Sequence, residues 1–86
     1  MIALARSRDE VNYKMAEDVK ITTKQKLIGC RNMIGYTQDD MAKYLGITRV
    51  TYNRKENKPE KFSFSEKEAI KILFKNSIPN YTDVFL

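Results

Sequence analysis

The sequence lacks histidine, and Cys30 is the only cysteine among its 86 residues. Imidazole and thiolate groups hold most protein zinc ions, so this composition excludes most zinc sites. It also excludes the Ser-His and Cys-His pairs of nucleophilic catalysis and removes the commonest general base. The chain has three glycines in total and no Gly-rich phosphate-binding loop. We therefore expect a protein that is not an enzyme and that uses no metal ion or cofactor.

Long apolar runs are missing as well. No stretch approaches the roughly 20 apolar residues of a membrane-spanning helix. The apolar start, MIALA, is short for a secretory signal. Cys30 has no partner for a disulfide and is expected to fill a small space in the core rather than to act as a reactive thiol. We expect a cytoplasmic protein whose length allows a single modest core.

Acidic side chains are the minority, which gives the chain a net charge of +5 and a pI near 9.4. In residues 1–23 the basic and acidic side chains are equal in number, so the whole positive excess falls in residues 24–86. This distribution is compatible with plain solubility and also with an anionic partner such as nucleic acid.

Two segments begin with the spacing of a capping box, in which a Ser or Thr is followed three positions later by Glu or Gln. Thr22 with Gln25 predicts a first helix that ends at Gly35, and Ser65 with Glu68 predicts a later helix with a broad apolar face.

Two further helices are predicted between these. Thr37 can cap a helix that ends at Gly46, and Thr48 can cap one that ends near Asn57. Because no strand pattern or repeat competes with these helices, the sequence predicts an all-α fold. At the end of the chain, Thr82 can cap a short turn.

The last three residues, VFL, can pack on the core or form a dimer surface. We favour packing on the core for this segment, which comprises Val84, Phe85 and Leu86.

The segment TQDDMAKYLGITRVTYNRKEN places a glycine between two short helices. Gly46 can accept the positive φ of a tight turn, and Ala42 is small enough for the two helices to approach closely. Ile47 and Tyr52 are then expected to anchor the second of these helices on the core.

On a helical wheel, residues 49–56 separate into two faces. Tyr52 and Glu56 share one face. The opposite face carries chemical groups that read bases in a DNA major groove: Arg and Asn hydrogen-bond to guanine and adenine, and apolar carbon contacts the thymine methyl group. Its members are Arg49, Val50, Asn53 and Arg54.

Residues 23–78, and less clearly those up to 86, resemble the helix-turn-helix domain of phage repressors and Cro proteins, which also occurs in the xenobiotic-response-element family of bacterial regulators. The similarity lies in TQDDMAKYLGIT and TYNRKEN. It implies a compact lambda-repressor-like domain of four to five helices over residues 23–86. It also implies a transcriptional regulator that binds a double-stranded DNA operator and can form a homodimer.

The resemblance assigns roles to individual positions. Arg49, Val50 and Arg54 match base-contacting residues, whereas Asn53 can contact adenine or phosphate or be simply exposed. Arg31 and Glu56 match a pair that joins the first helix to the end of the recognition helix, and we expect this pair to be partly buried. Phosphate contacts are expected from Gln38, Thr51, Asn57, Lys58 and Lys61.

Two positions depart from the family pattern. Lys58 replaces a common glycine, so Asn57 is expected to adopt the left-handed conformation itself. Lys55 occupies an often apolar position, and we expect its stem to cover the core while its amine stays in water.

Residues 1–22 are expected to be an N-terminal extension, either a short helix through Val11, Met15 and Val19 or a frayed arm. Because family domains begin near Met15, residues 1–14 can be an extension added in translation or cloning. Alternatively they form an arm that places Arg6 and Arg8 on the minor groove.

A second functional class keeps the same fold but gives it a protein partner. An antitoxin or antirepressor would act through an apolar surface rather than through DNA alone, because fold does not determine function.

Overall fold

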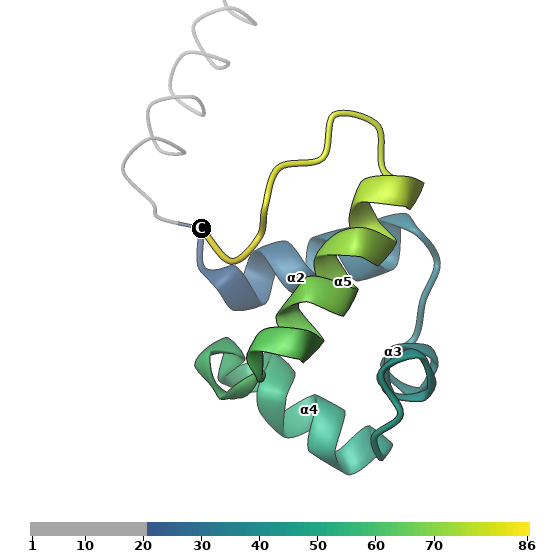
Figure 1. Ribbon diagram of the computed structural model, residues 1–86, viewed down its shortest axis with the longest axis vertical. Coiled ribbons are helices and arrows are strands. Elements are labelled where there is room, and N and C mark those ends of the chain that lie inside the picture. Colours follow the sequence, from purple (N-terminus) through teal and green to yellow (C-terminus); the bar gives the residue numbers. More distant parts are fainter. Residues whose placement is uncertain (1–20) are drawn as a thin grey trace, which may run out of the picture.

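The computed structural model describes residues 21–86, and the expectations for Arg6, Arg8, Val11, Met15 and Val19 lie outside them. The described part is all-helical and contains no strand, as predicted (Figure 1). None of its helices is long and apolar enough to cross a membrane. The elements are α2 (Thr23–Met33), α3 (Gln38–Leu45), α4 (Arg49–Asn57), the 3-10 turn η1 (Pro59–Lys61) and α5 (Phe64–Ser77).

Local side-chain caps set the starts of α2, α3 and α4. The Thr22 hydroxyl accepts from the Gln25 N–H, and the Gln25 side chain accepts from the Thr22 N–H, which confirms the predicted capping box. Thr37 and Asp40 form a second such box, with Asp in place of Glu. Hydrogen bonds from Thr37 to the Asp40 carboxyl group lower the pKa of that group.

The predicted cap of α5 was wrong by two residues. Ser63, not Ser65, caps this helix, and Glu66 completes the box: the Ser63 hydroxyl accepts from the Glu66 N–H at 3.1 Å. Both serines have a glutamate three positions later, so the spacing alone cannot choose between them. Core packing chooses, because the earlier start buries Phe62 and leaves Phe64 on the surface.

The two glycines that end α2 and α3 have the same geometry. Gly35 and Gly46 have φ angles of 76° and 72°. After α3, the Gly46 N–H donates to the Lys43 carbonyl and the Ile47 N–H donates to the Ala42 carbonyl. This is the hydrogen-bond pattern of a Schellman motif, and it turns the chain within three residues from α3 into α4.

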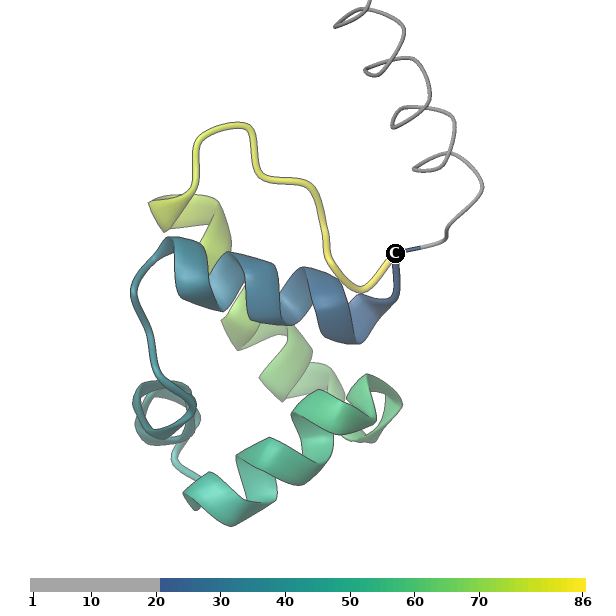
Figure 2. The ribbon, with the colours of Figure 1, turned by 180° about the vertical axis from the view of Figure 1, so that it is seen from behind.

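The core lies between α2, α3, α4 and α5. From behind, the C-terminal segment is seen to run back past α2 (Figure 2). Val84 in this segment is buried and Phe85 packs on the core, but Leu86 is 91% exposed, so packing of the tail extends only to Phe85. Each of α2, α3, α4 and α5 contributes fully buried core residues, which are Leu27, Met41, Ala42, Tyr52, Ile70 and Phe74.

The short turn near the C-terminus is held by different side chains from the one we expected. The Tyr81 hydroxyl accepts from the Val84 N–H, and Asp83 accepts from the Phe85 N–H. Thr82 is exposed and makes no such cap among the described residues. Cys30 packs against the core, and partial burial raises the pKa of its thiol.

The C-terminal end of α4 corrects two expectations. Asn57 is the last helical residue and does not take a positive φ; the chain leaves the helix at Lys58, with a φ of −133°, and Pro59 begins η1. A glycine is therefore not needed at position 58. The amine of Lys55 does not remain in water but pairs with Glu66 at 2.8 Å and 2.9 Å, which ties α4 to α5.

Candidate nucleic-acid interface

One face of α4 is anchored in the core, and this fixes which residues face outward. Thr48 caps the helix by accepting from the Thr51 N–H. Tyr52 is fully buried, and its ring packs against Phe62 with 5.8 Å between centroids. Since residues four apart lie on the same face of a helix, Glu56 is also carried inward, where it is 2% exposed.

The outward face of α4 carries the residues predicted to contact bases. Val50 is 62% exposed although it is apolar, and Arg49, Asn53 and Arg54 are exposed with it. The structure thus brings these four side chains together on one solvent-facing surface. We call this surface, formed by Arg49, Val50, Asn53 and Arg54, the outer face of α4.

The buried carboxylate of Glu56 joins three elements beneath this surface. It accepts from Arg31 Nε at 2.9 Å, from the Tyr52 hydroxyl at 2.7 Å and from Gln38 Nε2 at 2.9 Å. Arg31 also donates to the Tyr36 carbonyl at 3.0 Å. The structure therefore contains the Arg31–Glu56 pair, and Glu56 fixes α2 and α3 to α4. Burial, together with the bond to Glu56, raises the pKa of Tyr52.

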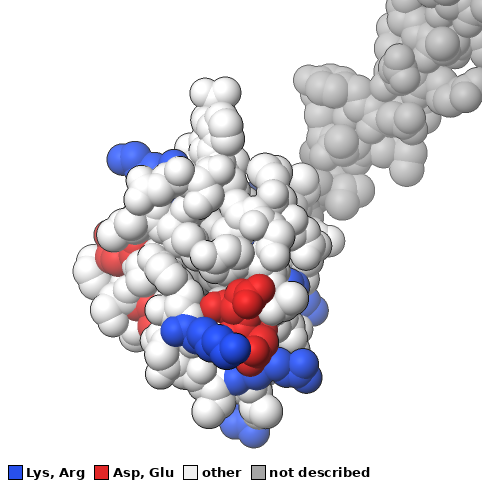
Figure 3. Space-filling model, turned by 90° about the vertical axis from the view of Figure 1, so that its right-hand side faces the viewer, with Lys and Arg blue, Asp and Glu red and all other residues white. Residues whose placement is uncertain are grey.

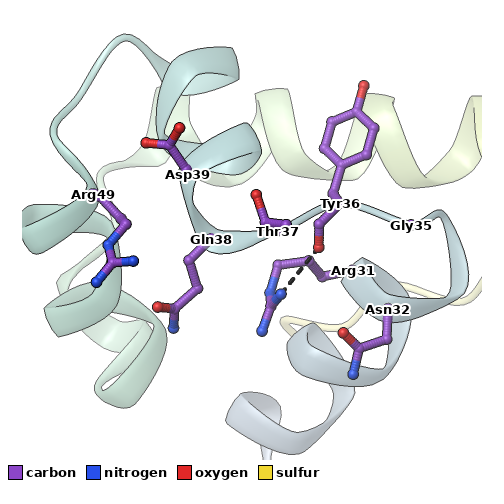
Figure 4. A pocket seen from close by; sticks show the side chains of 8 residues that line it. All are labelled: Arg31, Asn32, Gly35, Tyr36, Thr37, Gln38, Asp39 and Arg49. Carbon is purple, nitrogen blue, oxygen red and sulfur yellow. Dashed lines mark hydrogen bonds between the residues drawn. The ribbon is translucent and has the colours of Figure 1, made fainter.

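A hollow of about 670 Å³ lies at the N-terminal ends of α3 and α4. Arg49, Gln38 and Arg31 extend to the same side of it, with Gln38 in the middle, whereas Asp39 points the other way (Figure 4). Two guanidinium groups and an amide therefore face this hollow. Such groups are hydrogen-bond donors to phosphate oxygens.

A second hollow, of about 490 Å³, lies at the other end of α4. The charged side chains that line it, within the described part of the chain, are all basic. The structure thus brings together here one predicted base contact, Arg54, and four of the five predicted phosphate contacts. The lining residues are Thr51, Arg54, Lys55, Asn57, Lys58 and Lys61.

The charges on one face of the described part are unevenly distributed. On the face that Figure 3 shows, most Lys and Arg side chains gather at the lower end, where α3 and α4 lie in Figure 1, together with neighbouring acidic side chains. Within α3, Asp39 pairs with Lys43 at 3.3 Å. Among residues 21–86, no group of three or more His, Cys, Asp or Glu side chains is placed to hold a metal ion.

Sequence reasoning missed a chain of side-chain amides that crosses from α3 to α4. Gln38 Oε1 accepts from Asn53 Nδ2 at 3.2 Å, and Asn53 Oδ1 accepts from Asn57 Nδ2 at 3.4 Å. Gln38 and Asn53 are separated by 15 positions. Their contact depends on the angle between two helices, for which the sequence has no local signal.

The comparisons with known proteins agree with this geometry. A family model described as helix-turn-helix matches residues 29–73, which include α3, the turn at Gly46 and α4. A search of curated proteins and a search of solved structures gave no match to the chain.

Proposed function

The chain belongs to the helix-turn-helix family of DNA-binding transcription regulators, and on this premise we propose that it is a sequence-specific repressor or Cro-like regulator of a phage or prophage. In this role the chain catalyses no reaction. The observation that carries the proposal is the outer face of α4, which exposes two guanidinium groups and a valine on a rigidly anchored helix.

In the proposed complex, α4 lies in the major groove. Arg49 and Arg54 donate to guanine O6 and N7, and Val50 contacts a thymine methyl group. The support for this assignment is exposure combined with anchoring, because Tyr52 and Glu56 hold the opposite face of the helix in the core. A helix held in this way can present its outward side chains to bases in one fixed register.

The two hollows beside α4 are the proposed phosphate sites. Gln38 lies in the first, at the N-terminus of α3, where the helix dipole also favours an anion. Thr51, Asn57, Lys58 and Lys61 line the second. Because the hollows lie at the two ends of α4, they suit the two phosphate backbones that border one major groove.

We further propose that the protein binds its operator as a homodimer. Two copies of α4 would then enter successive major grooves, and the operator would be a pseudo-palindrome with half-sites about 10 bp apart or a multiple of that spacing.

In vitro selection from a random DNA pool tests the proposal. The expected result is a single enriched motif with two inverted half-sites at that spacing. A pool that stays random after several rounds, with the protein shown to be folded, would contradict sequence-specific binding. An enriched motif without inverted symmetry would contradict the dimer and leave base reading supported.

A second candidate function is that of an antitoxin or antirepressor that acts through a protein partner. Exposed apolar side chains favour it: Phe64 and Ile72 on α5 are 79% and 56% exposed, and Tyr44 on α3 is 42% exposed. Such a protein should copurify from its native host with one partner at a fixed ratio. Replacing Phe64 and Ile72 with serine should release that partner without changing affinity for DNA.

A further inference from the structure

Both ends of the Gln38 side-chain amide are held by α4. Its nitrogen, Nε2, donates to the buried Glu56 carboxylate at 2.9 Å, and its oxygen, Oε1, accepts from Asn53 Nδ2 at 3.2 Å. A 180° flip of this amide would place its carbonyl oxygen against the carboxylate and its N–H groups against the donor of Asn53. The two partners therefore fix one orientation of the amide.

This orientation decides what Gln38 can offer to DNA. The NH₂ group has two hydrogens, and Glu56 accepts one of them, so the second remains available for another acceptor. Gln38 lines the first hollow, between Arg49 and Arg31 (Figure 4). A donor held in a fixed direction binds a phosphate oxygen with a smaller loss of side-chain entropy than a freely rotating one.

The Asn53 side chain, by contrast, is held by hydrogen bonds that oppose its turning toward a base. Bidentate reading of adenine uses both the N–H and the carbonyl of an Asn amide at once. In this structure the nitrogen donates to Gln38, and the oxygen accepts from Asn57 Nδ2 at 3.4 Å. Turning the Asn53 amide toward an adenine would break both of these hydrogen bonds.

We infer that Asn53 is a positioning residue, which acts on DNA by fixing the phosphate-binding amide of Gln38 and does not itself read a base. This inference rests on the proposed DNA-binding function and replaces the base contact expected for Asn53 from the sequence. The hydrogen-bonded side-chain amides of Asn57, Asn53 and Gln38 then link the second hollow to the first across the outer face of α4.

A double-mutant cycle tests the inference. Affinities are measured for the selected operator and for random DNA with the wild type, Asn53→Ala, Gln38→Ala and the double variant. We expect Asn53→Ala to weaken binding to both DNAs by a similar factor, about 3- to 10-fold, the size of one hydrogen bond. In the Gln38→Ala background, Asn53→Ala should have little further effect, because the group that it positions is gone.

The matched control is Arg54→Ala, combined in the same way with Gln38→Ala. Arg54 is also exposed on α4 but lines the other hollow, away from Gln38. Its effect should add to that of Gln38→Ala. Alanine has a higher helix propensity than Asn, so Asn53→Ala should leave α4 folded, and an unchanged unfolding midpoint checks this.

Three results would overturn the inference. The first is a change of preference at one base pair in Asn53→Ala, which would show base reading. The second is an undiminished effect of Asn53→Ala in the Gln38→Ala background. The third is a weakening of binding by Gln38→Ala but not by Asn53→Ala.

A measurement without DNA keeps the inference separate from the proposed function. By NMR relaxation, the Gln38 side-chain amide should be rigid in the wild type, mobile in Asn53→Ala and still rigid in Arg54→Ala. If the protein bound no DNA but showed this pattern, the proposed function would fail and the positioning of Gln38 by Asn53 would stand. An amide that is equally mobile in all three proteins would overturn the positioning itself.

Discussion

At the scale of single residues, the Glu56 carboxylate joins α2, α3 and α4. A carboxylate that is 2% exposed is costly unless it is paired, and here it accepts from Arg31, Tyr52 and Gln38. No buried side-chain polar atom of the described residues lacks a hydrogen-bond partner. Removing the carboxylate would therefore take from the Tyr52 hydroxyl the acceptor that it has here, and would leave the charge of Arg31 with only the Tyr36 carbonyl.

We expect Glu56→Ala to lower the free energy of unfolding by about 3 to 5 kcal/mol, because it leaves one partner of a buried ion pair uncompensated. Asp39→Ala is the control. It removes the pair with Lys43, whose side chains are 53% and 77% exposed, and should cost less than about 1 kcal/mol. Equilibrium unfolding in urea measures both, and equal costs would contradict the structural role of Glu56.

At the scale of elements, the turn between α3 and α4 depends on backbone conformation rather than on space. Gly46 has a φ of 72°, but a Cβ atom placed there would meet no atom within 4 Å. We expect Gly46→Ala to cost roughly 1–2 kcal/mol, the penalty of a left-handed conformation for an ordinary residue. Gly46→Asn should cost less, since Asn tolerates this conformation. Thermal unfolding compares the two, and equal stability of Gly46→Ala and the wild type would contradict the argument.

The N-terminus of α5 has a pH-dependent ion pair. Burial acts to raise the pKa of Glu66, but hydrogen bonds from Lys55 and from the Ser63 N–H outweigh it and lower the pKa overall. A carboxyl group whose pKa is lower in the folded state adds stability above its unfolded pKa, and this stability is lost as the pH falls through the folded value. Glu66 should therefore stabilise the fold at neutral pH and cease to do so in acid.

We accordingly expect the free energy of unfolding to fall as the pH drops below about 4.5, the ordinary pKa of glutamic acid. Glu66→Gln should lower stability at neutral pH and flatten this dependence. Glu60→Gln, which changes an exposed glutamate of η1, should leave the dependence as it is. Urea unfolding at several pH values checks this, and an unchanged slope in Glu66→Gln would contradict the role of the Lys55–Glu66 pair.

Elements with local signals were predictable from the sequence, and contacts between elements mostly were not. The Thr22 capping box and the glycine that ends α3 are confirmed because their hydrogen bonds join residues a few positions apart. The start of α5 was misplaced because two serines offer the same spacing. The pair Lys55–Glu66 depends on how helices pack and has no local signal.

The same distinction holds for the candidate site. The helical wheel correctly placed Arg49, Val50 and Arg54 on an exposed face. Helical periodicity and the burial of Tyr52 determine which face of α4 is exposed. The bond between Gln38 and Asn53 required the angle between α3 and α4. Whether these side chains contact DNA stays a prediction.

At the scale of the whole molecule, the basic side chains predict a strong dependence of DNA binding on salt. Each phosphate neutralised on duplex DNA contributes about 0.9 to the negative slope of log affinity against log salt. Lys61 is exposed and lines the second hollow. We expect Lys61→Ala to weaken binding to all sequences and to reduce the slope by about 1. Titrations at several salt concentrations measure it, and an unchanged slope would place Lys61 away from the DNA.

The central claim is that the outer face of α4 reads bases, and the base preference of Arg54→Ala tests it most directly. Affinities of the wild type and this variant are measured on the selected operator, on all its single-base substitutions and on random DNA, with Lys61→Ala as the control. The predicted result is a loss of about 1–3 kcal/mol on the operator and of preference at one position in each half-site, with little change on random DNA. An Arg54→Ala variant that, like Lys61→Ala, weakens operator and random DNA by the same factor would contradict the claim.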